Sequence, residues 1–507
     1  MNDRPGAALR AYHERTKHSV ASVRGDPHGL DWDNQPRPFK VYTDLEPTAL
    51  PTELPGSQML ALDAIGGAGA GNAGQANLDA AGLARVLYFS AGILRRRAYP
   101  GGEIFFRAAA CTGALYHIDV YAVCAELDGL AAGVYHFGPH DFALRCLRAG
   151  DHRAALVAAA ANEPAVAAAP VVLVLTSTFW RNAWKYRTRT YRHSFWDAGT
   201  LLANLLAAAS SVGLSTRVVL GFVDDAVNAL VDVDPAHEAA VTLVALGSGA
   251  VAPPSVPSLP ALALETLPLS PHEIDYPLVR EAHAASSLAS GDEVRVWRAA
   301  AATEARPADG GPLVPLEPIS PAAVPEPVEA VILRRGSTRR FPQTAIPLAG
   351  LATVVACASR AVPLDVLVRP DLYVIVHAVD GLEPGSYVAT PDGRALVRLR
   401  AGDFRRTAGH LDLGQTLAAD AAANLYWLVD LDAAFRRLGN RGYRAAQLAA
   451  AIQGGRAYLA AYALGLGATG LTFFDDDVTT FFSPHAAGKD VMFLVAIGRR
   501  PIPRSGN

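Results

Sequence analysis

The chain contains the same long segment twice, and this repeat limits the possible folds more than any other feature of the sequence. The segment "RTYRHSFWDAGTLLANLL" beginning at Arg189 aligns without a gap on "RGYRAAQLAAAIQGGRAY" beginning at Arg441, so the offset is 441 − 189 = 252 residues. Two shorter blocks, "DGLAAGVY" with "DGLEPGSY" and "RAGD" with "RAGD", recur at the same offset. Three blocks that share one offset indicate a tandem duplication, and a duplicated domain that normally pairs with itself makes a dimer within one chain.

Both copies predict the same order of secondary-structure elements. Each has an arginine-rich segment that we interpret as a helix start, "GILRRRAYPG" or "AVILRRGSTRRFP", then a strand, "HIDVYAVCAEL" or "DLYVIVHAV", and a hairpin around "DGL". A long Ala/Leu helix with apolar residues three and four positions apart follows, and a buried strand, "AVTLVALG" or "VMFLVAIG", closes the copy. This mixture predicts an α+β fold for each copy, with a central mixed or antiparallel sheet flanked by helices.

The length supports two domains rather than one. A chain of 507 residues exceeds what one hydrophobic core usually serves, and 51% of its residues are hydrophobic, which is enough for two cores. We therefore expect domain 1 at residues 1–250 and domain 2, a more degenerate copy, at residues 328–507. Residues 251–327 are rich in Pro and Ala, and we expect them to form a connection along the surface.

Composition and spacing exclude several classes of function. A net charge of −3 gives no general attraction to nucleic acid or anionic membranes, and no apolar stretch has the length of a signal peptide or membrane span. The four cysteines lack metal-ligand spacing, and we expect the acidic run at Asp475 to cap a helix and the histidines His136 and His140 to flank a turn. We therefore expect no metal, no nucleic-acid partner and a cytoplasmic location. Neither a Rossmann fingerprint nor a P-loop occurs.

Three segments carry residues suited to chemistry, and each also has a plainer interpretation. Arginine clusters at Arg95 and Arg334 suit a phosphate, because guanidinium groups bind it bidentately, or they are simply solvated. The small residues at 110–114 allow a flat ligand close to the backbone, or they form a tight turn. The pair Lys185 and Tyr186 suits proton transfer if it is buried, or it belongs to an exposed loop.

Taken together, these segments resemble the SagB-type, or ThcOx-like, branch of the nitroreductase superfamily. The resemblance rests on "YHERTKHS", "LDWDNQPRPFKVY", "RRRAYPGGEIFFRAAACTGALYHIDVY", "WKYRTRTYRH" and "GFVDDAVNALVDVDPAHEAAVTLVALG". It covers residues 12–247 closely and residues 328–500 more loosely. Members of this branch are FMN-dependent dehydrogenases that oxidise thiazolines and oxazolines to azoles in modified peptides, and they work as intertwined dimers with FMN at the interface.

The resemblance implies a set of cofactor-binding residues and a catalytic pair. The phosphate and ribityl chain would be bound by the arginine-rich segments and by the end of the chain, at Arg334, Arg335, Ser337, Arg339, Arg95, Arg96, Arg499 and Arg500. The isoalloxazine ring would contact Ala110, Cys111, Thr112, Gly113, Ala114 and Leu115, and further Val218, Gly221, Gly470, Leu471 and Thr472. Lys185 and Tyr186 match the Lys-Tyr pair of the family, which is implicated in proton removal.

The two copies differ at these positions. The offset of 252 places Lys185 and Tyr186 on Arg437 and Leu438, so the second copy lacks the pair. We therefore expect one competent flavin site, formed by phosphate ligands of the second copy and the 110–115 segment of the first. The family commonly has Pro-Ser where this chain has Ala110 and Cys111, and Pro where it has His117.

Three functions are compatible with the sequence. The first is an FMN-dependent oxidoreductase that takes a hydride from an azoline or related small-molecule or peptide substrate, with other biosynthetic enzymes as candidate partners. The second is a nitroreductase-like or quinone-reducing enzyme that takes electrons from NAD(P)H. The third is a non-catalytic binding subunit of a biosynthetic complex that retains only the fold.

Overall fold

The structure is a computed structural model of the chain. It describes residues 5–25, 29–67, 77–99, 102–253, 259–262, 264–300 and 312–501. Among these residues, no helix is both long enough and apolar enough to cross a membrane.

Each copy of the repeat builds one seven-stranded antiparallel sheet, and the two sheets have the same strand order. The first sheet runs β1 (Pro47–Ala49), β6 (Ala143–Ala149), β5 (Gly133–Gly138), β4 (Ile118–Cys124), β7 (Val171–Thr178), β9 (Glu238–Leu246) and β8 (Thr216–Val219). The second runs β10 (Leu313–Pro315), β15 (Ala395–Ala401), β14 (Gly385–Ala389), β12 (Asp371–Val376), β16 (Ala423–Val429), β18 (Asp490–Gly498) and β17 (Gly467–Gly470). The expected duplicated α+β fold is confirmed.

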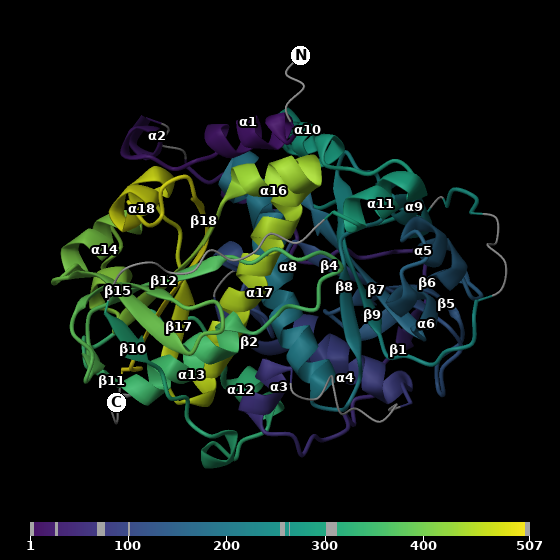
Figure 1. Cartoon of the computed structure of the whole chain (residues 1–507). Helices are drawn as coiled ribbons and strands as arrows, with labels where there is room; N and C mark the ends of the chain where they lie inside the picture. The colour runs from purple at the N-terminus through teal and green to yellow at the C-terminus, as the bar shows by residue number, and fades with distance from the viewer. Residues whose placement is uncertain are drawn as a thin grey trace.

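Two long helices lie between the sheets and join the copies (Figure 1). They are α8 (Thr190–Ser210) and α17 (Gly442–Ala463), and nearly all of their residues are buried because each packs on the other helix and on a sheet. Close approach depends on glycine: a Cβ at Gly199 would collide with Ala451, and one at Gly455 would collide with Ala203. The two copies therefore share one core.

Shorter helices occupy matching positions in the two copies, some packed on the two long helices and others on the sheets. In the first copy they are α3 (Ala61–Gly66), α4 (Ala80–Ala91), α5 (Arg153–Ala159), α6 (Pro164–Ala168), α7 (Phe179–Tyr186) and α9 (Asp224–Leu230). In the second they are α12 (Val328–Arg334), α13 (Leu348–Ser359), α14 (Arg405–Leu411), α15 (Thr416–Asp420), α16 (Leu431–Leu438) and α18 (Asp475–Phe482). The N-terminal segment adds α1 (Ala7–Arg15) and α2 (Val20–Gly25).

The arginine-rich segments do not begin helices, so that expectation is wrong. Arg95 and its two following arginines lie in strand β2 (Ile93–Tyr99), which pairs with β3 (Gly102–Arg107) in a separate exposed hairpin. Arg334 is the last residue of α12 rather than the first. Alternating side chains of a strand point to opposite faces, so consecutive arginines in β2 point to different surroundings.

The ungapped alignment of the repeat is also wrong in one stretch. In the first sheet Leu173 pairs with Val244, and in the second Leu425 pairs with Val495. Leu173 and Leu425 differ by 252 positions while Val244 and Val495 differ by 251, and the helix starts Asp224 and Asp475 also differ by 251. The second copy is therefore one residue shorter between β17 and α18. Backbone pairing reveals this shift, whereas the sequence has no mark of it.

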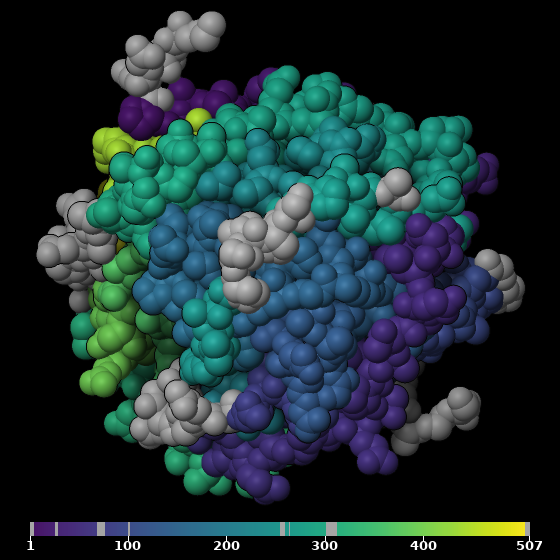
Figure 2. All heavy atoms as spheres, turned by 90° about the vertical axis from the view of Figure 1, so that its right-hand side faces the viewer, coloured from purple at the N-terminus to yellow at the C-terminus, as the bar shows by residue number. Residues whose placement is uncertain are grey.

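The segment between the copies contains more structure than a surface connection. It holds α10 (Pro277–Ala285), α11 (Gly291–Arg298) and strand β10, which belongs to the second sheet. In Figure 2 this teal segment spreads over the top of the face formed by the blue first copy. We propose that the second copy begins near residue 277, because α10 makes the same kind of contacts as α1.

Those contacts form two reciprocal clamps between the copies. Asp475, at the start of α18, accepts hydrogen bonds from Arg192 at 2.5 Å and Arg189 at 3.4 Å, both from the first copy. Asp224, at the start of α9, accepts hydrogen bonds from Arg441 at 2.5 Å and from Arg444 at 2.6 Å, both from the second copy. The same patch on each copy binds the other, as in a two-fold symmetric dimer.

The last turns of α1 and α10 contribute to these clamps in the same way. Arg192 donates to the carbonyl oxygen of His13 at 2.7 Å, and Arg444 donates to that of His283 at 3.0 Å. Hence α1 packs over the second copy and α10 over the first, which is the exchange of terminal segments expected of an intertwined dimer.

Candidate functional site

The repeat creates two pseudo-symmetric places where a ligand could lie between the copies. At one place the segment before β12 of the second copy contacts the turn after β8 of the first through Asp365, and the repeat puts the corresponding segments, before β4 and after β17, at the other. We call the pairing of residues 110–115 with residues 470–472 site A, and the pairing of residues 362–367 with residues 218–221 site B. The two places differ in whether groups of the protein itself occupy the turn.

At site A, Tyr186 with Lys185 beside it packs against the small-residue segment. Lys185 and Tyr186 are at the C-terminal end of α7, and the Lys185 Nζ lies 5.4 Å from the centre of the Tyr186 ring. Gly113 has φ +62°, and a Cβ there would come within 2.8 Å of the Tyr186 hydroxyl. Glycine is therefore required at this turn both for its left-handed backbone and for the space that the phenol fills.

The electrostatic surroundings of Tyr186 come from both copies. Burial, with the negative charge of Asp197 and the Cys111 thiol adding to it, raises the pKa of the Tyr186 phenol, while Arg339 of the second copy opposes the rise. Tyr186 is therefore a protonated phenol that can donate a hydrogen bond. Arg339 is exposed, and its charge acts on Tyr186 across the interface between the copies.

Asp197 of α8 lies behind the 111–113 turn and binds it directly. Its Oδ1 accepts hydrogen bonds from the Thr112 amide at 2.9 Å and the Thr112 hydroxyl at 2.7 Å, while its Oδ2 faces the Cys111 thiol at 3.1 Å. Burial and the charge of Asp197 raise the pKa of Cys111 well above its usual range, so the sulfur remains a thiol and donates to the carboxylate. The His117 Nε2 is 2.9 Å from the same Oδ2.

The two arginines at 334 and 335 are already engaged with protein groups. Arg334 forms an ion pair with Glu326 and donates to the carbonyl oxygen of Tyr462 at 2.8 Å. Arg335 is buried and donates to the carbonyl oxygens of Ala108 at 2.9 Å and Arg107 at 3.2 Å, which joins the second copy to the end of β3. Both residues hold the segment in place beside site A.

Other expected phosphate ligands divide into two groups. Ser337, whose hydroxyl bonds the Tyr458 hydroxyl at 2.8 Å, lies on this segment with Arg339, and Arg95 reaches the Arg335 carbonyl at 3.2 Å. The exposed Arg500 has its guanidinium 5.7 Å from the centre of the Tyr462 ring. By contrast, Arg96 donates to the carbonyl oxygen of His140 and Arg499 to that of Ala345, so both guanidinium groups are committed elsewhere.

The ring-contacting turn of site A is open. Gly470 is exposed, and a Cβ there would have only the Leu494 carbonyl oxygen nearby, at 3.8 Å. Leu471 and Thr472 are half-buried, and the Thr472 hydroxyl oxygen is inaccessible yet has no hydrogen-bond partner. A buried polar atom without a partner is uncommon in folded proteins and is consistent with a ligand at this turn.

Protein groups occupy the 218–221 turn of site B, although the 361–372 segment beside it lines a cavity of about 310 Å³. The Asp365 carboxylate accepts hydrogen bonds from the Leu220 and Gly221 amides, both at 2.8 Å, and so occupies the backbone donors of that turn. Arg298 of α11 donates to the Gly221 carbonyl oxygen at 2.9 Å, and Val218 is fully buried. Asp365 and α11 therefore occupy the space beside Val218 and Gly221, where the sequence predicts contacts with a flavin.

Sequence reasoning missed the residues that decide this difference. Asp365 is 252 positions after Gly113, so the repeat offset marks a small-to-charged exchange at the turn, but nothing in the sequence says that its carboxylate reaches the other copy. Asp197 likewise stands 252 positions before Ala449, in a helix whose residues are all buried. In both cases a comparison of the two copies gives a signal that single motifs do not.

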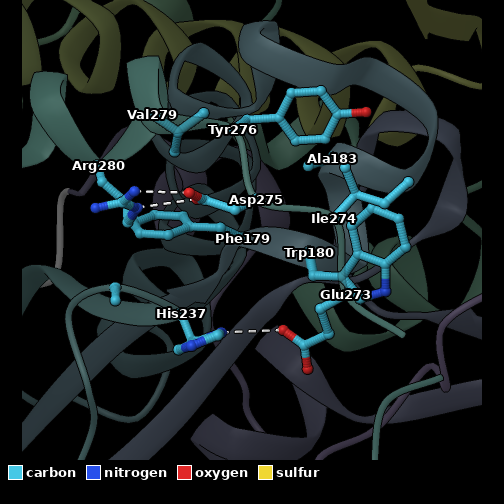
Figure 3. Close-up of a pocket in the computed structure, with 11 residues that line it drawn as sticks. Phe179, Trp180, Ala183, His237, Glu273, Ile274, Asp275, Tyr276, Val279 and Arg280 are labelled. Atoms are coloured by element: carbon cyan, nitrogen blue, oxygen red, sulfur yellow. Dashed lines mark hydrogen bonds and ion pairs between the residues drawn. The ribbon is translucent and has the colours of Figure 1, made fainter. Parts of the chain in front are cut away.

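A separate cavity of about 250 Å³ lies on the far side of α7 (Figure 3). Its apolar walls come from α7 and from the segment at 274–279, with Phe179, Trp180 and Tyr276 as the aromatic members. The charged side chains drawn at its edge pair with each other, since His237 lies 3.1 Å from Glu273 and Arg280 lies 2.6 Å from Asp275. This arrangement leaves an apolar interior.

Within the described part of the chain, one group of side chains has metal-ligand spacing. His13, Glu14 and Asp490 have ligand atoms within 4.8 Å of one another. Cations already neutralise the carboxylates, because Arg10 is 2.8 Å from Asp490 and Lys17 is 2.9 Å from Glu14. These ion pairs show that the cluster belongs to the contact between α1 and the second copy.

The comparisons with known proteins agree with this architecture. The model of the Nitroreductase family matches residues 91–248 and 332–499, once in each copy. The nitroreductase-like protein MJ1384 of Methanocaldococcus jannaschii is 24% identical over 151 residues, which cover 30% of this chain and 73% of that protein. The trifolitoxin-processing protein TfxB of Rhizobium leguminosarum bv. trifolii is 30% identical over 149 residues, which cover 28% of this chain but only 40% of TfxB.

A solved structure extends the likeness to the duplicated arrangement. A nitroreductase-like protein from Anabaena variabilis superposes with a TM-score of 0.78 and 26% identity, and the match covers 97% of this chain and 99% of that one. Because the family model matches both copies and more than half of the chain, this protein belongs to the nitroreductase family of oxidoreductases.

Proposed function

We propose that this protein is an FMN-dependent oxidoreductase of the SagB type with one flavin site per chain, and that site A is this site. The observation that carries the proposal is the position of Tyr186, which lies against Gly113 of its own copy and is influenced electrostatically by Arg339 of the other. Site A thus combines a proton-handling pair, a flat backbone surface and cations, whereas site B has none of these open to a ligand.

The residues at site A fit FMN in charge and in shape. Ser337, Arg339, Arg500 and Arg95 would hold the phosphate end, since a hydroxyl and several guanidinium groups suit a dianion. The small residues at 110–114 and the open turn at Gly470 leave backbone surface for a planar ring. The unpartnered Thr472 hydroxyl would supply a polar contact to that ring.

FMN, when bound, accepts a hydride from the substrate, and the protein must then remove the accompanying proton. Tyr186 keeps its own proton because its pKa is raised, so we assign it to hydrogen-bond and orient the substrate. Lys185, the adjacent residue, would take the proton. An azoline is a suitable substrate class because losing a hydride and a proton makes its ring aromatic, and the likeness to a toxin-processing protein supports a peptide or peptide-like substrate.

The first test is the number of FMN molecules bound per chain. We expect about one after purification with FMN and heat release, because Asp365 and Arg298 close site B. Two per chain would contradict the single-site assignment, and none would favour a non-catalytic binding subunit. The flavin-loaded protein is then mixed with a small thiazoline or with NADPH, without oxygen. Bleaching of the flavin by NADPH but not by thiazoline would favour the nitroreductase-like alternative.

A further inference from the structure

The hydrogen bonds around Asp197 determine how this buried carboxylate is charged. The side chain is only 5% exposed, and three donors from the 111–113 turn converge on it: the Thr112 amide, the Thr112 hydroxyl and the Cys111 thiol. Several donors on one carboxyl group favour its ionised form. An ionised carboxylate in the interior needs a cation nearby to offset its lost hydration.

The only side-chain cation candidate that the described residues place in hydrogen-bond contact with Asp197 is His117. Its Nε2 is 2.9 Å from Oδ2, and its ring is fully buried. The other titratable groups that face this region are Tyr186 from α7, His193 from α8, Arg107 from β3 and Arg339 from the second copy. The Arg107 guanidinium is directed elsewhere, because it donates to the Pro38 carbonyl at 2.7 Å and lies over the Tyr116 ring.

The far side of the His117 ring supplies a chain of two serine hydroxyls. Its Nδ1 is 2.9 Å from the Ser177 oxygen, which is 2.9 Å from the Ser194 oxygen, and Ser194 donates to the Thr190 carbonyl at 3.1 Å. Ser177 and Ser194 can each donate to the other. When Ser194 donates to the Thr190 carbonyl, Ser177 donates to Ser194 and accepts from the Nδ1–H of His117. The Nε2–H then bonds the carboxylate, so in this arrangement both ring nitrogens carry hydrogen.

The second copy shows that the fold does not need this arrangement. At the positions 252 residues on from Asp197, His117 and Ser177 stand Ala449, Arg369 and Val429. Cys111 and Thr112 correspond to Pro363 and Leu364. The reciprocal clamps, in contrast, are kept in both copies. All members of the network are therefore absent from the copy whose site is closed and present in the copy whose site is open.

We propose that His117 and Asp197 form a buried imidazolium–carboxylate pair that positions the 111–113 turn of site A and keeps the region beneath it electrically neutral. Asp197 fixes the turn against which Tyr186 packs, and His117 cancels the charge of Asp197. Both are positioning residues. Their benefit to catalysis rests on the proposed function, because an unbalanced anion there would oppose the arrival of a hydride at the flavin.

The charge state of His117 can be measured without turnover or flavin. We expect ¹⁵N-histidine spectra of the full chain at pH 8 to show one buried imidazole with both nitrogens protonated. His193 serves as the internal reference, because burial and neighbouring cations lower its pKa well below the usual value and keep it neutral. The signal should disappear in His117→Gln and move in Ser177→Ala, which gives a second assignment if the first variant fails to fold.

Asp197→Asn then tests whether the pair acts as proposed. The amide retains an acceptor oxygen for Thr112 but carries no charge, so the His117 signal should change to that of a neutral imidazole. With FMN content checked, flavin reduction should slow at least 10-fold and its pH profile should change. A neutral His117 in the unaltered protein would overturn the proposal. So would an Asp197→Asn variant whose rate of flavin reduction falls by the same factor at every pH. Retention of the charged signal in a protein that binds no FMN would instead reject the proposed function and leave the pair intact.

Discussion

Lys185→Ala should lower the rate of flavin reduction by at least 100-fold while leaving about one FMN per chain. Positioned acid–base groups typically contribute about 100- to 10,000-fold to a reaction rate, and Lys185 is adjacent to the Tyr186 that packs on Gly113. Its side chain is only partly buried, and it lies at the end of a helix, so removal should not disturb the core. The measurement is anaerobic bleaching of the flavin by a thiazoline, with the FMN content determined on the same sample.

The second copy supplies a matched control for this substitution. Arg437 occupies the position of Lys185 in α16, where it donates to the Leu367 carbonyl at 2.6 Å, far from site A. Arg437→Ala should therefore leave flavin reduction within about two-fold of the unaltered protein. Tyr186→Phe retains the ring and removes the hydroxyl, and we expect an intermediate loss. Full activity of Lys185→Ala would remove the lysine from the mechanism, and loss of FMN would mean that it binds the cofactor instead.

Asp475→Asn should be the most destabilising single change among the residues considered, lowering the free energy of unfolding by about 3–5 kcal/mol. The carboxylate is 2% exposed and bonds Arg189 and Arg192, so its loss leaves two buried guanidinium groups without their anion. Urea unfolding measured at pH 7 reports the change. The neighbouring Asp476 side chain is 73% exposed, and Asp476→Asn should cost less than about 1 kcal/mol. Equal changes in the free energy of unfolding for the two substitutions would show that the clamp stabilises the fold no more than an exposed ion pair does.

The clamps also predict how stability depends on pH. Arg441 and Arg444 overcome the effect of burial and lower the pKa of Asp224 from 3.8 to about 2, and Arg192 and Arg189 lower that of Asp475 further. For a carboxyl group with a lowered pKa, the stabilisation is present above the unfolded value and is lost as the pH falls toward the folded one. The midpoint urea concentration should thus fall between about pH 4 and pH 2, and less steeply in a chain with Asp475→Asn. A flat profile over this range would contradict the clamp.

Much of the fold was predictable because the chain contains an internal comparison. Two copies of one pattern identified the paired sheets, the long helices at 190–210 and 442–463, and the closing strands. The arginine-rich segments were misread because Arg95 lies in a hairpin whose strands are exposed, so no hydrophobic periodicity distinguished it from a helix start. The one-residue shift between β17 and α18 was invisible because the two aspartates at 224–225 align equally well with either pair of the three at 475–477.

The sequence by itself determined the duplication, the family resemblance and the fact that only one copy keeps Lys185 and Tyr186. Tertiary structure decided which of the two interfaces is open, because the Asp365 carboxylate and Arg298 reach backbone groups more than 70 positions away in the chain. It also decided that Tyr186 lies against Gly113 and that Asp197 and His117 meet beneath the same turn. The local sequence shows which side chains are available. The charge and the contacts of these side chains depend on the distant segments that pack around them and exclude water.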